Sequence, residues 1–291
     1  MRPITKDVLK FLIGFSMVLI VSALLAPWLH TFLPFKFDRI LRRLIMIGSL
    51  ALVYGLVRSR RQNLVSLGLA WEKRSLPLLG KGYLIGILLV MVLTLLQWKL
   101  GVRFWRLSDK DTWHWIGFYL KGIGAGLLIG TIEELFFRAF LFMTFSELWN
   151  KGVSLVVTNL VYAVVHFFPK GKVFVDQTPT LHDSFRIFHA AVTPSPEVLH
   201  QILPAMAGLF LFGLILSFLY LRSGSLYLSM GVHAGAILGL KINHRYFPEI
   251  ADKFTLMSGT KNLYDGITGL TVLLLATLMA GWWSSRQKAS L

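Results

Sequence analysis

Cysteine is absent from this sequence, and acidic residues are few, with 14 aspartates and glutamates among 291 residues. The lack of cysteine excludes a disulfide framework. The chain also has no internal repeat and no low-complexity tract, so neither a repeat architecture nor a compositionally biased linker is expected. Against the few acids stand 30 lysines and arginines, which give a formal net charge of +16.

This excess of basic residues does not indicate a nucleic-acid partner. The lysines and arginines are distributed over nearly every polar segment rather than gathered in one basic domain. Anionic headgroups of a lipid bilayer are the simpler partner for charges placed in this way. Basic residues counted over alternate loops are nearly balanced, so the positive-inside rule leaves the orientation in the membrane open.

Hydrophobic residues make up 55% of the chain, too many for an ordinary soluble domain of this length. Apolar segments of about 17 to 25 residues, long enough to cross the hydrocarbon core of a bilayer, recur along the sequence. We therefore predict an all-α, polytopic membrane protein with a bundle of about eight transmembrane helices. The predicted spans are 9–29, 40–57, 78–98, 113–148, 153–168, 202–221, 225–240 and 267–283. The fourth is long enough for one tilted helix or for two pieces.

Two segments need separate consideration. Basic residues precede span 9–29 and small residues end it, so a signal peptide cleaved after Ala26 competes with the retained helix that its length favours. The segment 169–200 contains four prolines and mixed charge, and it is too polar to span. We predict a loop there with a short interfacial helix at 184–192, acting as a lid or docking element.

Ionisable side chains inside the predicted spans mark a candidate site. A charge at mid-membrane costs at least about 2.5 to 3.5 kcal/mol, so such residues face the bundle interior and are functional candidates. They are Lys121, Glu133, Glu134, Arg138, His166 and His233.

The two adjacent glutamates should have different roles, because successive residues of a helix point about 100° apart. Glu133 continues a face of glycines that includes Gly126 and Gly130, where a second helix can approach closely. Glu134 and Arg138 lie one turn apart, the spacing at which a carboxylate and a guanidinium can pair.

Simpler interpretations exist for each of these residues. Both acids could neutralise Arg138 at a helix end, although one arginine cannot neutralise two carboxylates that project so far apart. Each histidine alone would be interpreted as a buried core residue. Together, Glu133, His166 and His233 on three separate helices form a set that can polarise a water molecule.

The same residues carry a resemblance to a known family. The CaaX-protease and bacteriocin-processing (CPBP or Abi) intramembrane endopeptidases, related to the type II CaaX prenyl proteases, contain EExxxR, FxxxH and HxxxN on successive helices. The first motif is complete here, as EELFFR at residues 133–138. The second reads YAVVH, with Tyr162 replacing phenylalanine and His166 intact. The third reads HAGAI, with His233 present and Ile237 replacing asparagine.

This resemblance implies a helical bundle with a catalytic cavity that opens inside the membrane. It covers residues 113–243 as the protease core, with N-terminal helices and basic loops at 1–112 and a loop and last helix at 244–291. It implies an endopeptidase, in a bacterial or archaeal cell membrane, that cleaves a membrane-embedded or lipidated, for example prenylated, peptide.

The resemblance also implies roles for the site residues. Glu133, helped by His166, would activate water for attack on a peptide carbonyl, and His233 would stabilise the oxyanion. Glu134 and Arg138 would hold the helix and tune Glu133.

Ile237 puts the second oxyanion donor in doubt. Loss of one such donor typically costs about 100- to 1000-fold in turnover. Ser229, one turn before His233, could replace it, as could Tyr162 or Asn159. A non-catalytic membrane binding or regulatory protein is therefore an alternative. An unrelated transporter or channel is a further one, although the sequence shows no interrupted spans in two matching halves.

No cofactor is required if glutamate and water suffice. Glu133, His166 and His233 could instead hold zinc or another divalent metal with one open position. The sequence contains no HExxH motif, which favours the glutamate mechanism.

Overall fold

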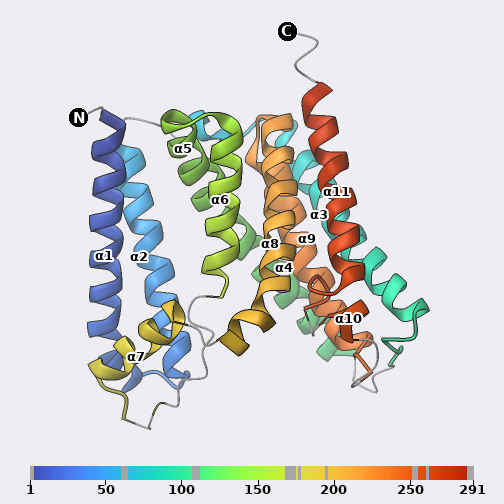
Figure 1. The fold of residues 1–291 in the computed structure, drawn as a ribbon, viewed down its shortest axis with the longest axis horizontal. Helices are drawn as coiled ribbons and strands as arrows, with labels where there is room; N and C mark the ends of the chain where they lie inside the picture. The colour runs from blue at the N-terminus through green and yellow to red at the C-terminus, as the bar shows by residue number, and fades with distance from the viewer. Residues whose placement is uncertain are drawn as a thin grey trace.

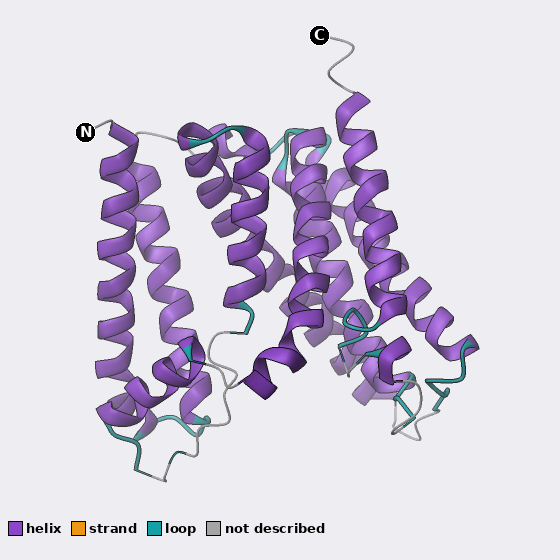
Figure 2. Cartoon of the chain, in the orientation of Figure 1, coloured by secondary structure: helices purple, strands orange, loops and turns teal. Residues whose placement is uncertain are grey.

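A computed structural model describes residues 3–59, 65–106, 112–167, 175, 178–193, 196–250, 255–259 and 262–286. Over these residues the chain is a bundle of helices without a β-strand, apart from one isolated bridge between Arg103 and Glu249 (Figures 1 and 2). The all-α prediction is confirmed.

Each predicted span overlaps a helix. The end of the fifth span, predicted at 168, is wrong, because its helix ends at Val165 and residues 166–167 form a turn. The long helices are α1 (Pro3–His30), α2 (Phe37–Ser59), α3 (Ser75–Lys99), α4 (Thr112–Glu134), α6 (Lys151–Val165), α8 (Pro196–Ser223), α9 (Leu226–Tyr246) and α11 (Ile267–Ser285). The span predicted at 113–148 is one continuous run, in which α4 is followed by the π-helix η2 (Leu135–Phe142) and by α5 (Met143–Leu148). The shorter elements are η1 (Val65–Leu69), α7 (Leu181–Val192) and α10 (Thr255–Ser258).

The outer surface of the bundle is apolar and its interior is partly polar. By length and composition, five of the described helices can cross a membrane, namely α1, α2, α3, α8 and α11. Large apolar side chains point outward from them, among them Ile20, Leu88 and Met279. Polar side chains such as Asn159 and Ser217 are fully buried instead. This distribution fits a lipid solvent, because lipid offers no hydrogen bonds to polar groups. The prediction of a polytopic membrane fold is confirmed.

Helix α9 occupies the interior and packs most extensively on α3 and α4. Glycines allow the close approach on both sides. A Cβ added at Gly86 of α3 would lie 2.1 Å from the carbonyl oxygen of Val232, and one at Gly126 of α4 would lie 2.7 Å from that of Ala234. The glycine face predicted for the fourth span therefore packs on the helix that carries His233.

The predicted interfacial helix exists as α7, which begins three residues before the predicted start. Its first turn is stabilised by Asp183, whose carboxylate accepts hydrogen bonds from the backbone N–H and the hydroxyl of Thr180. Its buried face docks on α1, where the Ser184 hydroxyl donates to the Ala23 carbonyl at 3.0 Å. Figure 1 shows α7 lying across the ends of α1 and α2.

The end of the predicted loop 169–200 is wrong. Helix α8 begins at Pro196, so residues 196–200 are helical. A proline is well tolerated in the first turn of a helix, where the missing N–H has no intrahelical acceptor, so the prolines did not mark a longer loop. Positions 168–174, 176–177 and 194–195 lie outside the described residues.

Candidate active site

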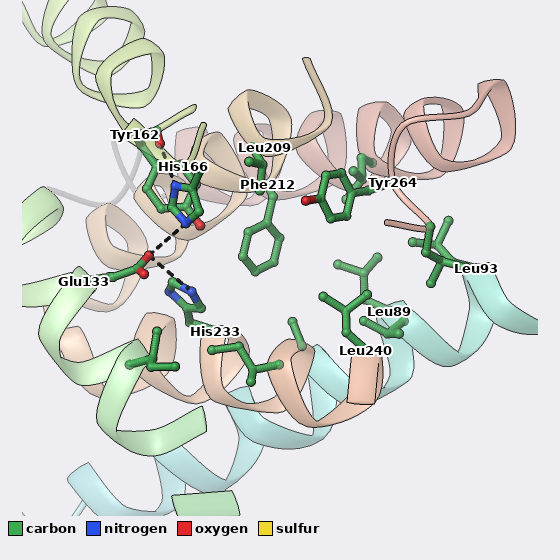
Figure 3. A pocket seen from close by; sticks show the side chains of 16 residues that line it. Leu89, Leu93, Glu133, Tyr162, His166, Leu209, Phe212, His233, Leu240 and Tyr264 are labelled. Carbon is green, nitrogen blue, oxygen red and sulfur yellow. Dashed lines mark hydrogen bonds and ion pairs between the residues drawn. The ribbon is translucent and has the colours of Figure 1, made fainter. Parts of the chain in front are cut away.

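Two histidine side chains, one at the C-terminal end of α6 and one within α9, lie beside Glu133 of α4. This residue lies in the last turn of α4, on the side that faces α9. Its Oε2 atom lies 3.3 Å from Nε2 of His166 and 3.6 Å from Nε2 of His233 (Figure 3). His166 follows the last residue of α6, and His233 lies within α9. The three residues singled out from the sequence are thus brought together by the fold.

Both imidazole rings are oriented through their other nitrogen atom. Nδ1 of His166 donates to the backbone carbonyl of Tyr162 at 2.7 Å. Nδ1 of His233 donates to Oε1 of Glu134 at 3.1 Å. A carbonyl and an ion-paired carboxylate can only accept, so each Nδ1 carries a proton and each Nε2 is directed to Glu133.

Glu134 and Arg138 form a fully buried ion pair, with 2.9 Å between Arg138 Nη1 and Glu134 Oε1. The predicted pairing of these residues is confirmed. The other guanidinium nitrogen, Nη2, donates to the carbonyl of Gly213 on α8 at 2.9 Å and to Oδ1 of Asn159 on α6 at 3.4 Å. The guanidinium also lies over the Tyr162 ring, 4.9 Å from its centroid. Arg138 therefore links α4 and η2 to two neighbouring helices.

The sequence did not reveal that His233 contacts both glutamates. Glu133 and Glu134 project differently, as expected, but His233 bridges them with its two ring nitrogens. The π-helix that begins at Leu135, directly after the glutamates, also left no recognisable sequence signal. Such segments are frequent at functional sites.

The residues named as substitutes for the missing asparagine differ in their placement. The Ser229 hydroxyl is buried, donates to the Leu226 carbonyl at 3.1 Å and is not part of the cavity wall described below. The Asn159 side chain already forms hydrogen bonds with Arg138 and Ser217. Tyr162 lines the cavity and packs against His166, with 4.4 Å between the ring centroids.

Glu133, His166 and His233 line one end of a cavity of about 320 Å³. Leucines from α3 and α9 line the other end, among them Leu89, Leu93 and Leu240 (Figure 3). Ile237 is also part of the wall. The volume lies in the range of small-ligand sites, and a mostly apolar wall with few polar groups is typical of them.

Glu133, His166 and His233 are also the predicted ligands of a metal ion. Within the described residues, no group of three or more histidine, cysteine, aspartate or glutamate side chains has a geometry that could hold a metal ion. Glu133, His166 and His233 as metal ligands remain a prediction from the sequence.

Comparison with protein families gives a match over part of the chain. Residues 115–238 match the model of a family described as type II CAAX prenyl endopeptidase Rce1-like. The family resemblance is confirmed. The Rce1-like segment contains all three motifs and lies within the core predicted at 113–243. A search of curated proteins found no match, and neither did a search of solved structures.

The match implies CAAX prenyl endopeptidase activity in general. Together with the apolar helices, it indicates a membrane protein with protease function.

Proposed function

We propose that the chain is an intramembrane endopeptidase that hydrolyses a peptide bond in a lipidated or otherwise membrane-associated peptide. The observation that supports it best is the position of Glu133, whose carboxylate lies between two oriented imidazoles at the end of an apolar cavity. A carboxylate at this position can act as a base on a water molecule that enters from the cavity.

The orientation of the two rings leaves both Nε2 atoms facing Glu133. Both Nδ1 atoms donate outward, so with two neutral rings the Nε2 lone pairs would point at the Glu133 carboxylate. Three lone pairs converging within 3.3 to 3.6 Å repel one another. The oxyanion role assigned to His233 requires a proton on its Nε2 atom, and such a proton also removes the repulsion between His233 and Glu133.

The reaction uses both groups. Glu133, helped by His166, takes a proton from water while the water oxygen bonds to the carbonyl carbon of the scissile peptide. The carbonyl oxygen becomes an oxyanion, which accepts a hydrogen bond from His233. When the C–N bond breaks, the proton moves to the leaving nitrogen, which departs as an amine. The products are a free amino group and a carboxylic acid, which releases its proton to solvent, and Glu133 is again a carboxylate.

The cavity has features that would suit a lipidated peptide. Its apolar end can hold a hydrocarbon chain, because burying one methylene group contributes about 0.8 kcal/mol. A prenyl group, as in the family description, is a chain of this kind. The peptide bond would then lie at the Glu133 end.

A Glu133→Gln variant tests this function. Glutamine keeps the size of the side chain but cannot take a proton, so cleavage of a fluorogenic prenylated peptide should fall by about 100-fold or more. Glu72→Gln is the matched control, because within the part of the chain that the structure describes the Glu72 side chain pairs only with the exposed Arg74, and the variant should keep wild-type activity. Wild-type cleavage by a folded Glu133→Gln protein would contradict the proposal.

One observation favours the alternative of a non-catalytic binding protein. Ile237 lines the cavity near His233 and offers no hydrogen-bond donor to an oxyanion. If the wild type binds the prenylated peptide but does not cleave it, the non-catalytic function is supported. Metal analysis of the purified protein, with assays before and after chelation, distinguishes the metal-assisted mechanism, because only that mechanism loses activity on metal removal.

A further inference from the structure

A tyrosine from outside the family-matched segment enters the wall of the cavity. Tyr264 lies in the loop before α11, and both Leu263 and Tyr264 line the cavity. In Figure 3 the Tyr264 ring lies between Phe212 and the leucines of α3, with its hydroxyl directed towards the end that holds Glu133.

The backbone of this loop is held in an unusual conformation. Leu263 has a φ of 73°, a left-handed value that is rare for a branched side chain, and it is fully buried. Its carbonyl accepts a hydrogen bond from Gln97 of α3 at 3.4 Å. The Gln97 amide also donates to Thr268, while its oxygen accepts from the buried Arg103 at 2.6 Å. A conformation of this kind persists only where its surroundings enforce it, which is common at functional sites.

Two glycines bring neighbouring helices against Tyr264 itself. A Cβ added at Gly208 of α8 would lie 2.3 Å from the Tyr264 carbonyl oxygen. One added at Gly269 of α11 would lie 2.7 Å from the Tyr264 Cα. The backbone of Tyr264 is therefore packed tightly against α8 on one side and α11 on the other, and its side chain lines the cavity.

The Tyr264 hydroxyl is a donor without a partner in a mostly apolar space. It forms no hydrogen bond with any of the residues that the structure describes. Burial, together with the nearby Asp265, raises the pKa of Tyr264 to about 12, so the phenol is neutral at physiological pH and can donate a hydrogen bond. A peptide that covers the hydroxyl and excludes water would leave it unpaired at a cost in free energy unless the peptide offers an acceptor.

We propose that Tyr264 is a substrate-binding residue that donates a hydrogen bond to an oxygen of the peptide, away from the scissile bond. This inference rests on the proposed function. A hydrocarbon chain has no acceptor, so the partner is a backbone carbonyl or the terminal carboxylate of the peptide. An extended peptide advances about 3.3 to 3.6 Å per residue, so a short peptide can reach both Glu133 and Tyr264. Tyr264 would fix the register of the peptide, which Ile237 cannot do.

The test is a Tyr264→Phe variant, which removes only the hydroxyl. Loss of a hydrogen bond formed equally in the bound substrate and the transition state raises KM and leaves kcat unchanged. We expect KM for the prenylated peptide to rise about 2- to 10-fold if the acceptor is a carbonyl, and more if it is a carboxylate. Tyr227→Phe is the matched control, because the Tyr227 hydroxyl donates to the Leu69 carbonyl and Tyr227 does not line the cavity.

Two peptides identify the acceptor. If substitution raises KM more for a peptide with a free terminal carboxylate than for the same peptide with a terminal amide, the acceptor is the carboxylate. Equal effects identify a carbonyl. An unchanged KM for both peptides overturns the proposal, as does a fall in kcat at constant KM, which would place the phenol in the chemical step.

Failure of the proposed function gives a different result. If the wild type cleaves neither peptide, the endopeptidase proposal fails, and the dissociation constant of the same peptides still measures the effect of Tyr264→Phe. A weaker complex supports the binding role, and equal affinity refutes it.

Discussion

Arg138 is a charged residue that needs several hydrogen-bond acceptors because it is buried. It is fully buried, and its guanidinium binds acceptors on three helices, in Glu134, Asn159 and Gly213. The pairing with Glu134 could be predicted from the sequence because the two residues lie one helical turn apart. The other two acceptors are 21 and 75 residues away along the chain, so they depend on how the helices pack. Local spacing carries no information of that kind.

An Arg138→Met variant tests the importance of this pair. It leaves the buried Glu134 carboxylate without its cation, which should cost about 3 to 5 kcal/mol of folding free energy. The double variant Glu134→Gln/Arg138→Met removes both charges and should be more stable than Arg138→Met alone. Unfolding in mixed detergent micelles measures the folding free energy of Arg138→Met and of the double variant. Strictly additive effects of the two substitutions would show that the residues are not coupled.

At the scale of elements, the position of α9 depends on glycine. This helix carries His233 and is enclosed by α3 on one side and α4 on the other. Apolar windows of the right length were enough to locate every long helix, and the angular position of the α4 glycines predicted a close helix contact. The partner helix was not identified, because the glycines of α3 belong to a span without a motif and the small residues around His233 in α9 do not show which helix they contact.

Two glycines of α3 provide a matched pair of variants. A Cβ at Gly86 would lie 2.1 Å from the Val232 carbonyl oxygen, whereas one at Gly80 would meet open space. Gly86→Ala should therefore push α9 away and destabilise the fold by about 1 to 3 kcal/mol. Gly80→Ala should be neutral or stabilise by about 0.5 to 1 kcal/mol, because alanine favours the helix. Thermal unfolding gives the melting temperature of each variant. Equal melting temperatures for Gly86→Ala and Gly80→Ala would contradict the close contact between α3 and α9.

At the scale of the whole molecule, the cavity is assembled from helices that are distant in sequence. Its wall includes residues of α3, α4, α6, α8, α9 and α11 and of the loop before α11. The sequence predicted a cavity and the three ionisable residues at its end. It did not predict the apolar end or Tyr264, since apolar residues in a membrane protein face lipid, other helices or a cavity without any difference in type.

Filling the cavity should affect lipidated substrates selectively. Ala236 of α9 lines the cavity, and an Ala236→Phe side chain would occupy part of the space for a hydrocarbon chain. Excluding two methylene groups costs about 1.6 kcal/mol, so KM for a prenylated peptide should rise about 10-fold or more. A peptide without the lipid should change little. Leu88→Phe, on the outer face of α3, is the control. Equal effects on both peptides would mean that the lipid binds elsewhere.

The cavity wall is formed both by the Rce1-like segment and by parts of the chain outside it. Glu133, His166 and His233 belong to the Rce1-like segment, while Leu89, Leu93 and Tyr264 come from parts of the chain outside it. Under the proposed function, part of the substrate-binding wall is therefore encoded outside the segment that carries the proposed catalytic residues. If the proposed function holds, mutations in the flanking stretches would alter which peptide is accepted while Glu133, His166 and His233 stay unchanged, so a new specificity could evolve without loss of activity.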